Sequence, residues 1–258
     1  MGYRIDREIH VHGSSWAKQG AGYFSDKGMA AGYVAEIIRV ARDARPSTVA
    51  DLGGGTGFIL EQLAEAGIGD RVRLVVIDES VAQLSVCGPR VVPLQRSILE
   101  LDRRDLLNCG ETLMLISRSV MHYSGFEGQA PWLRHVRSLM KPGEWFVHQP
   151  GCADDAEMSA ALNSLFDRMG LDKWVPHREE LLKMLAGSGF EVTGDLPAPS
   201  VGMVSDELVL RYGVPPLRMT EIGEGLRQGC AHRPDFYRAT PEGFVFDFPY
   251  RIITCRAE

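Results

Sequence analysis

Closely spaced glycines between two acidic residues are the clearest chemical feature of this sequence. An apolar run ends at Asp51, and Gly53, Gly55 and Gly57 follow at alternate positions before a helical pattern begins. Residues without a Cβ let the backbone bend sharply and lie close against a ligand. After a strand and before a helix, this arrangement is typical of a loop that binds a nucleotide-type cofactor.

The second acidic residue is Asp78, which ends a β-branched run 21 positions after Gly57. At that separation a second parallel strand delivers a carboxylate to the ribose hydroxyls, and an ionised carboxylate accepts from both hydroxyls of an adenosine. The dinucleotide pattern G-x-G-x-x-G fits less well, because Phe58 occupies its third glycine position. An NAD-dependent oxidoreductase is therefore disfavoured, and the absence of a following Gly-Lys-Ser/Thr excludes a P-loop.

The segment from Val49 to Phe58 resembles motif I of class I S-adenosylmethionine-dependent methyltransferases, and Asp78 resembles the acid of their motif II. The resemblance covers about residues 46–195 and the last strand. It implies S-adenosylmethionine as the cofactor, with the glycine loop under its methionine part and Asp78 on the ribose. The residues expected to contact the cofactor are Tyr3, Tyr23, Asp51, Gly53, Gly55, Gly57, Asp78, Glu79, Ser97, Ile98, Arg118 and Ser119.

Residues beyond the fourth and fifth strands are the candidates for catalysis, because ligands of an open α/β sheet bind at the carboxyl ends of its strands. The segment from Ser117 to Gly125 resembles the one after strand four in small-molecule O-methyltransferases, where a histidine is the general base. That histidine matches His122, and the preceding basic residue matches Arg118. A neutral imidazole accepts a proton at physiological pH. His148, at the end of the fifth strand, is expected to face the same crevice as a second candidate base.

This match departs from the family pattern at some positions, so a second interpretation of His122 stays open. Tyr123 and Ser124 replace the Asp-Trp pair of the family, and Ser97 stands where the family often has an acid near the adenine amino group. Related histidines also occur as residues that only line the substrate pocket. His122 is therefore a candidate base or a pocket residue.

The composition excludes several other classes of protein. The net charge is −6 and no basic run stands out, so nucleic acid is not an expected partner. No segment is long and apolar enough for a membrane span, and the N-terminus lacks the pattern of a signal peptide. The 5 cysteines contain no C-x-x-C pair, which predicts a cytoplasmic protein without a disulfide frame or a metal site. The expected partner is a small-molecule substrate, and a homodimer is left open.

Strand and helix patterns alternate from Thr48 onward, which predicts an α/β, Rossmann-like sheet of seven mostly parallel strands with helices on both faces. A cluster of aromatic residues and glycines near the N-terminus suits a lid over a sulfonium, which aromatic faces stabilise. The predicted single domain spans residues 1–258, with a helical lid at 1–45, a cofactor-binding core at 46–196, an inserted flap at 197–243 and a last strand at 250–256.

The expected function is methyl transfer from S-adenosylmethionine to a small-molecule acceptor, in secondary metabolism. One alternative keeps the cofactor and changes the chemistry, by intramolecular cyclisation or aminopropyl-type transfer that releases methylthioadenosine. The other alternative is a non-catalytic protein that binds the cofactor. The missing Asn/Asp-Pro-Pro-Tyr motif for amine acceptors leaves the non-methyl chemistry open.

Overall fold

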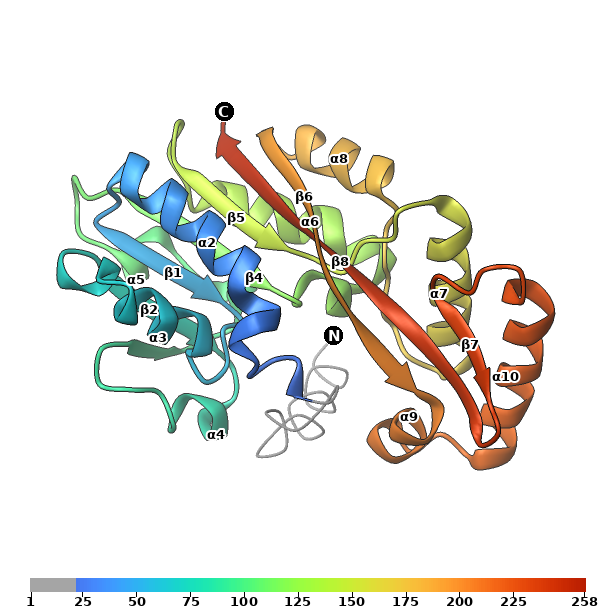
Figure 1. Ribbon diagram of the computed structural model, residues 1–258. Helices are drawn as coiled ribbons and strands as arrows, with labels where there is room; N and C mark the ends of the chain where they lie inside the picture. The colour runs from blue at the N-terminus through green and yellow to red at the C-terminus, as the bar shows by residue number, and fades with distance from the viewer. Residues whose placement is uncertain (1–21) are drawn as a thin grey trace.

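A sheet of 8 strands forms the centre of the computed structural model, which describes residues 22–258 (Figure 1). The strand order is β3-β2-β1-β4-β5-β8-β6, with β7 paired to β8. Strands β1 to β5 are parallel, and β8 runs antiparallel to β5, β6 and β7. The strands are β1 (Thr48–Leu52), β2 (Arg73–Asp78), β3 (Val92–Gln95), β4 (Leu113–Arg118), β5 (Trp145–Gln149), β6 (Phe190–Val204), β7 (Tyr237–Thr240) and β8 (Gly243–Ala257). The Rossmann-like fold is confirmed, but the sheet has one strand more than predicted.

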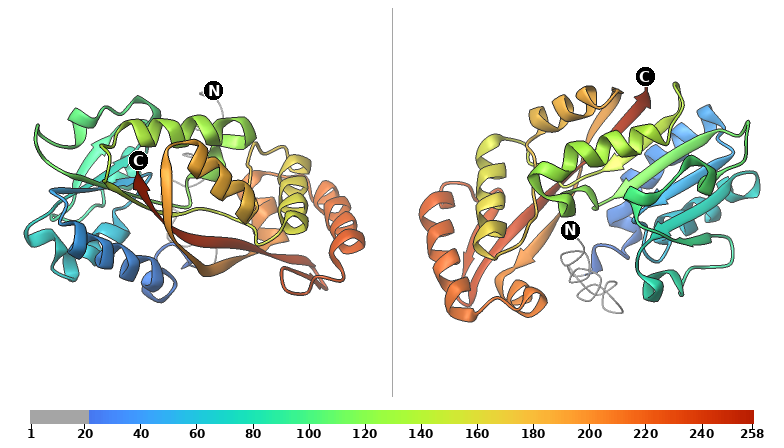
Figure 2. Two further views of the ribbon diagram at one scale, coloured as in Figure 1. Left: turned by 90° about the horizontal axis from the view of Figure 1, so that it is seen from above. Right: turned by 180° about the vertical axis from the view of Figure 1, so that it is seen from behind.

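Helices cover both faces of the parallel part of this sheet (Figures 1 and 2). On one face lie α2 (Lys27–Ala44), α3 (Phe58–Glu65) and α4 (Val81–Leu84); on the other lie α5 (Arg103–Leu106), α6 (Gly125–Ser138) and α8 (Arg178–Gly187). Short 3-10 helices among the described residues include η2 (Ile68–Asp70), η3 (Ile98–Glu100) and η4 (Met121–Ser124). Side chains of β1 alternate between the two faces, since Val49 packs with the first group and Ala50 and Leu52 with the second.

Helix α2 corrects the prediction of an N-terminal lid for the described part of that region. Its residue Tyr33 is buried against the sheet, where its hydroxyl accepts from the Ser117 amide at 3.0 Å. The same hydroxyl lies 3.0 Å from the Val147 carbonyl. The helix ends at Ala44, before Pro46. Residues 27–44 therefore belong to the core, while the rest of the expected lid, including Tyr3, lies outside the described residues.

Strands β6 and β8 extend the sheet well beyond β5 and replace the predicted flap. They pair from Phe190 opposite Ala257 to Val204 opposite Val245. The last strand thus begins at Gly243 rather than at residue 250. Helices α7 (Ala156–Arg168), α9 (Ser205–Tyr212) and α10 (Pro216–Cys230) pack around this ribbon together with β7.

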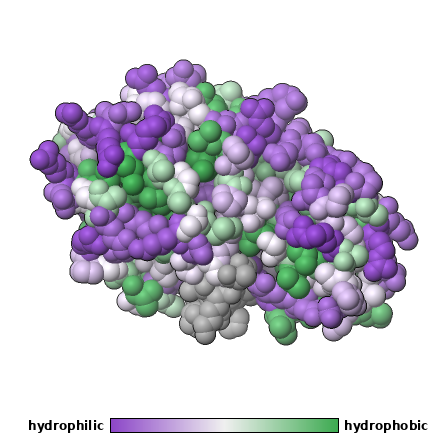
Figure 3. Space-filling model, in the orientation of Figure 1, coloured by the Kyte–Doolittle hydropathy of each residue, from purple (hydrophilic) through white to green (hydrophobic). Residues whose placement is uncertain are grey.

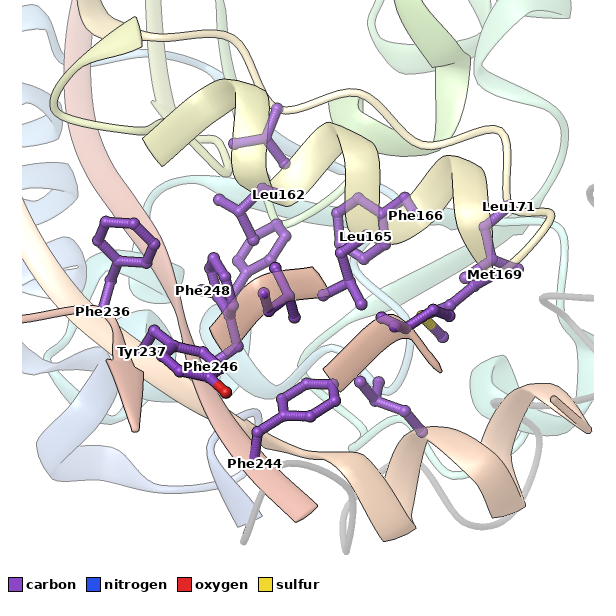
Figure 4. Packing of buried hydrophobic residues seen from close by; sticks show 14 of the residues in the cluster. Leu162, Leu165, Phe166, Met169, Leu171, Phe236, Tyr237, Phe244, Phe246 and Phe248 are labelled. Atoms are coloured by element: carbon purple, nitrogen blue, oxygen red, sulfur yellow. The ribbon is translucent and has the colours of Figure 1, made fainter. Parts of the chain in front are cut away.

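A separate hydrophobic core holds this extension together (Figure 4). Every second residue of β8 from Phe244 to Tyr250 is aromatic, and Phe244, Phe246 and Phe248 are buried on one face of the ribbon. They pack with Leu162 and Phe166 of α7. Alternating aromatic residues in Phe-Val-Phe-Asp-Phe-Pro-Tyr are a period-2 pattern, so the earlier start of this strand is visible in the sequence.

One face of the molecule, seen in Figure 3, is largely polar. In the face shown in Figure 3, apolar residues form separate groups among hydrophilic ones. Two of the most exposed apolar side chains, Leu210 and Leu217, lie on α9 and α10. Among residues 22–258, none of the helices is both long and apolar enough to cross a lipid bilayer.

Candidate active site

The glycine loop leaves the carboxyl end of β1 in a conformation that side chains would obstruct. Gly53, Gly55 and Gly57 have φ values of 71°, 57° and 74°, which L-residues with a Cβ rarely adopt. A Cβ on Gly55 would lie 2.1 Å from Oε1 of Gln83, and one on Gly53 would lie 2.6 Å from a methyl of Val120. The loop therefore packs closely against Gln83 of α4 and against Val120 in the segment that follows β4.

Asp78 ends β2 beside this loop. Its Oδ2 accepts from the Gly55 amide at 3.0 Å, and its Oδ1 accepts from the Ser80 amide at 2.8 Å. Burial raises the pKa of Asp78, and these backbone donors oppose that rise. Asp78 pairs with Gln95 of β3, so Ser97 follows at the same edge of the sheet. Ser97, Ile98 and Glu79 are all partly exposed there.

Asp51 is the buried member of the acidic pair. Only 1% of the residue is exposed, and its Oδ1 has no hydrogen-bond partner among the described residues. Burial, followed by the charge of Asp78, raises its pKa to about 7, although Arg118 opposes the shift. A buried carboxylate oxygen without a partner is costly. A ligand group that donates a hydrogen bond would satisfy it, so this end of the loop fits a polar cofactor.

Arg118 ends β4 next to β1 and packs against the start of the described chain. Its guanidinium lies 4.8 Å from the ring centre of Tyr23 and donates to Oε1 of Gln149 at 3.2 Å. Tyr23 also stacks on Tyr250 at 5.5 Å, and its hydroxyl donates to the Pro199 carbonyl. Tyr23 thus joins the cofactor side of the sheet to the β6–β8 extension.

Ser119 and His122 lie in the turn after β4. Ser119 has a φ of 61°, an uncommon value for a residue other than glycine, and its hydroxyl lies 2.6 Å from that of Tyr250. Strained backbone of this kind often occurs at functional sites. His122 is 4% exposed, and its ring contacts Tyr123 at 4.1 Å and Phe248 at 5.2 Å between centres.

Both residues line a pocket whose free volume is about 40 Å³. We call it the aromatic pocket, because six of its residues carry aromatic rings. Those six are Phe24, Tyr123, Phe166, Tyr212, Phe248 and Tyr250. Its other walls include Lys173 and Arg211. Concave, apolar pockets with a few polar groups are the usual form of small-molecule sites.

The structure brings most of the predicted site together and separates His148 from it. The loop, Asp51, Asp78, Ser97 and the β4 turn share the carboxyl edge of adjacent strands, at the point where the strand order reverses. His148 instead points into the core under α6, where it stacks on Phe146 at 5.0 Å and contacts Trp132 at 5.7 Å.

The surroundings of His148 argue against its expected role as a base. The side chain is fully buried, and both ring nitrogens lack a hydrogen-bond partner among the described residues. Burial lowers its pKa to about 3. It shares a face of β5 with Phe146, two positions earlier, so strand alternation alone places both side chains in the core.

This environment predicts an acid-sensitive contribution of His148 to stability. Because its folded-state pKa lies below the ordinary value of about 6.5, its contribution is complete above that pH and is lost as the pH falls toward 3. Between about pH 8 and pH 5.5 this group alone should cost about 1.4 kcal/mol of unfolding free energy. Urea unfolding at both pH values should show that loss in the wild type and a smaller one in His148→Leu. Equal losses in the two proteins would contradict this account.

Sequence reasoning missed the far wall of the aromatic pocket. Lys173, Tyr212 and Phe248 come from three different segments, the α7–α8 connection, α9 and β8. Only Phe248 belongs to a pattern that the sequence displays, the alternating aromatic residues of β8.

Comparisons with known proteins agree with this architecture. A scan against protein-family models and a search of curated proteins find no match. Among solved structures, the YcgJ protein from Bacillus subtilis is 14% identical, with a TM-score of 0.65 over 88% of this chain and 99% of its own. The 1,6-didemethyltoxoflavin-N1-methyltransferase of Burkholderia thailandensis, with 1,6-didemethyltoxoflavin and S-adenosylhomocysteine bound, is 16% identical, with a TM-score of 0.58 over 99% of this chain and 88% of its own. The cyclase SpnF is 14% identical, with a TM-score of 0.50 over 82% of this chain and 75% of its own. The chain therefore has the Rossmann-like fold of the class I S-adenosylmethionine-dependent methyltransferases.

Proposed function

We propose that this protein is an enzyme that transfers the methyl group of S-adenosylmethionine to a small-molecule acceptor. The observation that carries the proposal is the direct contact between the glycine loop and Asp78, 3.0 Å from the Gly55 amide to Oδ2, at the edge of the sheet that also forms the aromatic pocket. A nucleoside cofactor needs such a loop and acid together, and an acceptor needs the adjoining pocket.

The chain's own residues fit the cofactor. Asp78 would hold the ribose hydroxyls, and the loop at Gly53 and Gly55 would lie against the methionine part. Asp51 offers its unpartnered buried oxygen to a hydrogen-bond donor of the ligand. When bound, S-adenosylmethionine supplies a methyl group activated by its sulfonium. Arg118 with the rings of Tyr23 and Phe24 would close this side of the site.

His122 is the residue that we propose as general base. In methyl transfer the acceptor atom would bond to the methyl carbon as the bond from that carbon to the sulfonium sulfur breaks, and a hydroxyl or amine acceptor would release its proton to the base. His122 stands in the aromatic pocket, on the turn next to Ser119 and Val120, and Val120 reaches the glycine loop. A base in hydrogen-bond reach of the acceptor accelerates such a step by about 10²–10⁴-fold.

Incubation of the protein with S-adenosylmethionine, followed by mass spectrometry of the nucleosides, tests the proposal. Calorimetry should show one saturable site for S-adenosylhomocysteine, and the methyl donor should stay intact until an acceptor is added. The absence of any binding of either nucleoside would contradict the proposal. The expectation of a role in secondary metabolism stays a prediction.

The similarity to the cyclase SpnF favours a second candidate function. That protein has the same fold and is named for a cyclisation, so the fold also occurs outside methyl transfer. In this protein the competing reaction would be an intramolecular cyclisation of the aminocarboxyl chain of S-adenosylmethionine, which releases methylthioadenosine. Release of methylthioadenosine without an added acceptor, in the same mass-spectrometric experiment, would favour it over methyl transfer.

A further inference from the structure

Asp51 carries a buried carboxyl group that lies directly against the glycine loop. Only 1% of the residue is exposed, and its Oδ1 lacks a hydrogen-bond partner among the described residues. A Cβ placed on Gly54 would lie 2.5 Å from Oδ2 of Asp51, so the backbone of the loop packs against this carboxyl group. An ionised carboxylate in such a place loses its hydration without gaining donors in return, which favours its protonated form.

A second carboxyl group strengthens this preference. Asp51 pairs with Val76 of β2, and Asp78 lies two positions further along that strand. Two carboxylates that share one site repel each other, so the pair holds a proton more readily than two separate acids would. Asp78 accepts from two backbone amides, whereas Oδ1 of Asp51 accepts from none among the described residues. The shared proton therefore belongs on Asp51.

The other charged and titratable neighbours of Asp51 come from α2, β4 and the segment after α4. Arg118 of β4 favours the ionised carboxylate, but its effect is smaller than those of burial and of Asp78. Tyr33 of α2 and Cys87, whose Sγ contacts the glycine loop, interact with the charge of Asp51. Burial raises the pKa of both Tyr33 and Cys87, so they stay neutral near pH 7. Among these neighbours the pKa of Asp51 is raised to about 7.

We infer that binding of the cofactor releases a proton from Asp51 to the solvent, an inference that rests on the proposed function. S-adenosylhomocysteine has one cationic group, the ammonium of its amino acid part, and the loop at Gly53 and Gly55 is expected to lie against that part. A positive charge held by the loop stabilises the ionised form of the buried carboxyl group beside it, and this effect needs no direct contact. Arg118, on the next strand, would offset the carboxylate of the same part. Dissociation of the nucleoside returns the proton to Asp51.

Calorimetry of S-adenosylhomocysteine binding counts the released proton in the wild-type protein. The titration is repeated at pH 7 in phosphate and in imidazole, because the two buffers differ in their enthalpy of ionisation. We expect about 0.4–0.5 proton to be released per bound nucleoside at that pH, where about half of Asp51 is protonated. Affinity should rise about five- to tenfold from pH 6 to pH 8, as the ionised fraction of Asp51 grows. A binding enthalpy that is the same in both buffers, with an affinity that does not change over this range, overturns the inference.

Variants assign the proton to Asp51. Asp51→Asn has the shape of the protonated acid but cannot ionise, so it should release no proton on binding. We expect it to bind S-adenosylhomocysteine at least about tenfold more weakly than wild type at pH 8, with a deficit that is about five- to tenfold smaller at pH 6. Asp70→Asn, which removes an exposed acid before β2, should keep the wild-type release. Proton release that persists in a folded Asp51→Asn protein contradicts the role of this residue.

Two controls keep the outcomes distinct. Thermal melting shows whether Asp51→Asn folds, and when it does not, Asp51→Ala and the wild-type comparison between buffers decide the matter. The same titrations separate this inference from the proposed function. Failure of S-adenosylhomocysteine to bind at any pH contradicts the proposed function, whereas binding of this nucleoside without release of a proton contradicts only the inference about Asp51.

Discussion

Replacing His122 by glutamine should lower kcat by about 10²–10⁴-fold while affinity for S-adenosylhomocysteine stays within about twofold of wild type. Glutamine is similar in size but takes no proton near neutral pH, so the aromatic pocket keeps its shape and loses its base. His122 lines that pocket and lies outside the glycine loop, which is why cofactor affinity should not change. Turnover is measured with an acceptor at saturating S-adenosylmethionine.

The pH profile distinguishes a base from a residue that only lines the pocket. An acceptor that ionises in solution needs no base, so the deficit of His122→Gln should shrink as the pH rises toward the acceptor's own pKa. A residue that only shapes the pocket would produce a deficit that does not depend on pH. His148→Leu is the matched control, because it removes the other candidate histidine from the core and should retain turnover. Wild-type turnover in His122→Gln would show that His122 is not the general base.

Replacing Asp78 by alanine should weaken S-adenosylhomocysteine binding by about 1.5–3 kcal/mol, or about 10- to 150-fold. The carboxylate is expected to accept from the ribose hydroxyls, and it also accepts from the amides of Gly55 and Ser80. Removal of the carboxylate thus takes away a contact with the ribose. It also loosens the glycine loop, which is expected to contact the methionine part of the cofactor. Calorimetry with purified protein measures the change.

Asp70→Ala is the matched control for this variant. Asp70 is an exposed residue just before β2, at the opposite end of the strand from Asp78. Because both residues are aspartates, each variant changes the net charge by the same amount. Affinity should change only in Asp78→Ala. Thermal melting of both proteins checks that a loss reflects the site and not the fold. Equal affinities in the wild type and Asp78→Ala would show that the ribose is not held there.

The glycine loop and Asp78 could be predicted because the sequence patterns that identify them each span only a few residues. An apolar run makes β1, glycines at alternate positions make the loop, and Asp78 follows at the spacing of the next strand. Each of these features depends on backbone conformation or strand burial within one βαβ unit. Strand β1 therefore begins at Thr48 and strand β2 ends at Asp78, as predicted.

His148 shows where local reasoning failed. A residue at the end of a parallel strand can face the ligand crevice or the core, and the apolar run Trp-Phe-Val does not distinguish the two faces of a strand buried on both sides. Packing of α6 on β5 covers the face that His148 shares with Phe146. The burial of the imidazole, and hence its lowered pKa, follows from that packing.

The sequence by itself determined the fold class, the glycine loop and the acid that faces it, because period-2 burial and glycine conformation act over a few residues. Only the tertiary structure decided the shape of residues 197–243 and the far wall of the aromatic pocket. Strand β6 finds its register with β8 across a long connection, and η4, α7, α9 and β8 meet at the aromatic pocket. Contacts between segments so far apart arise from the packing of whole elements, which no local pattern encodes.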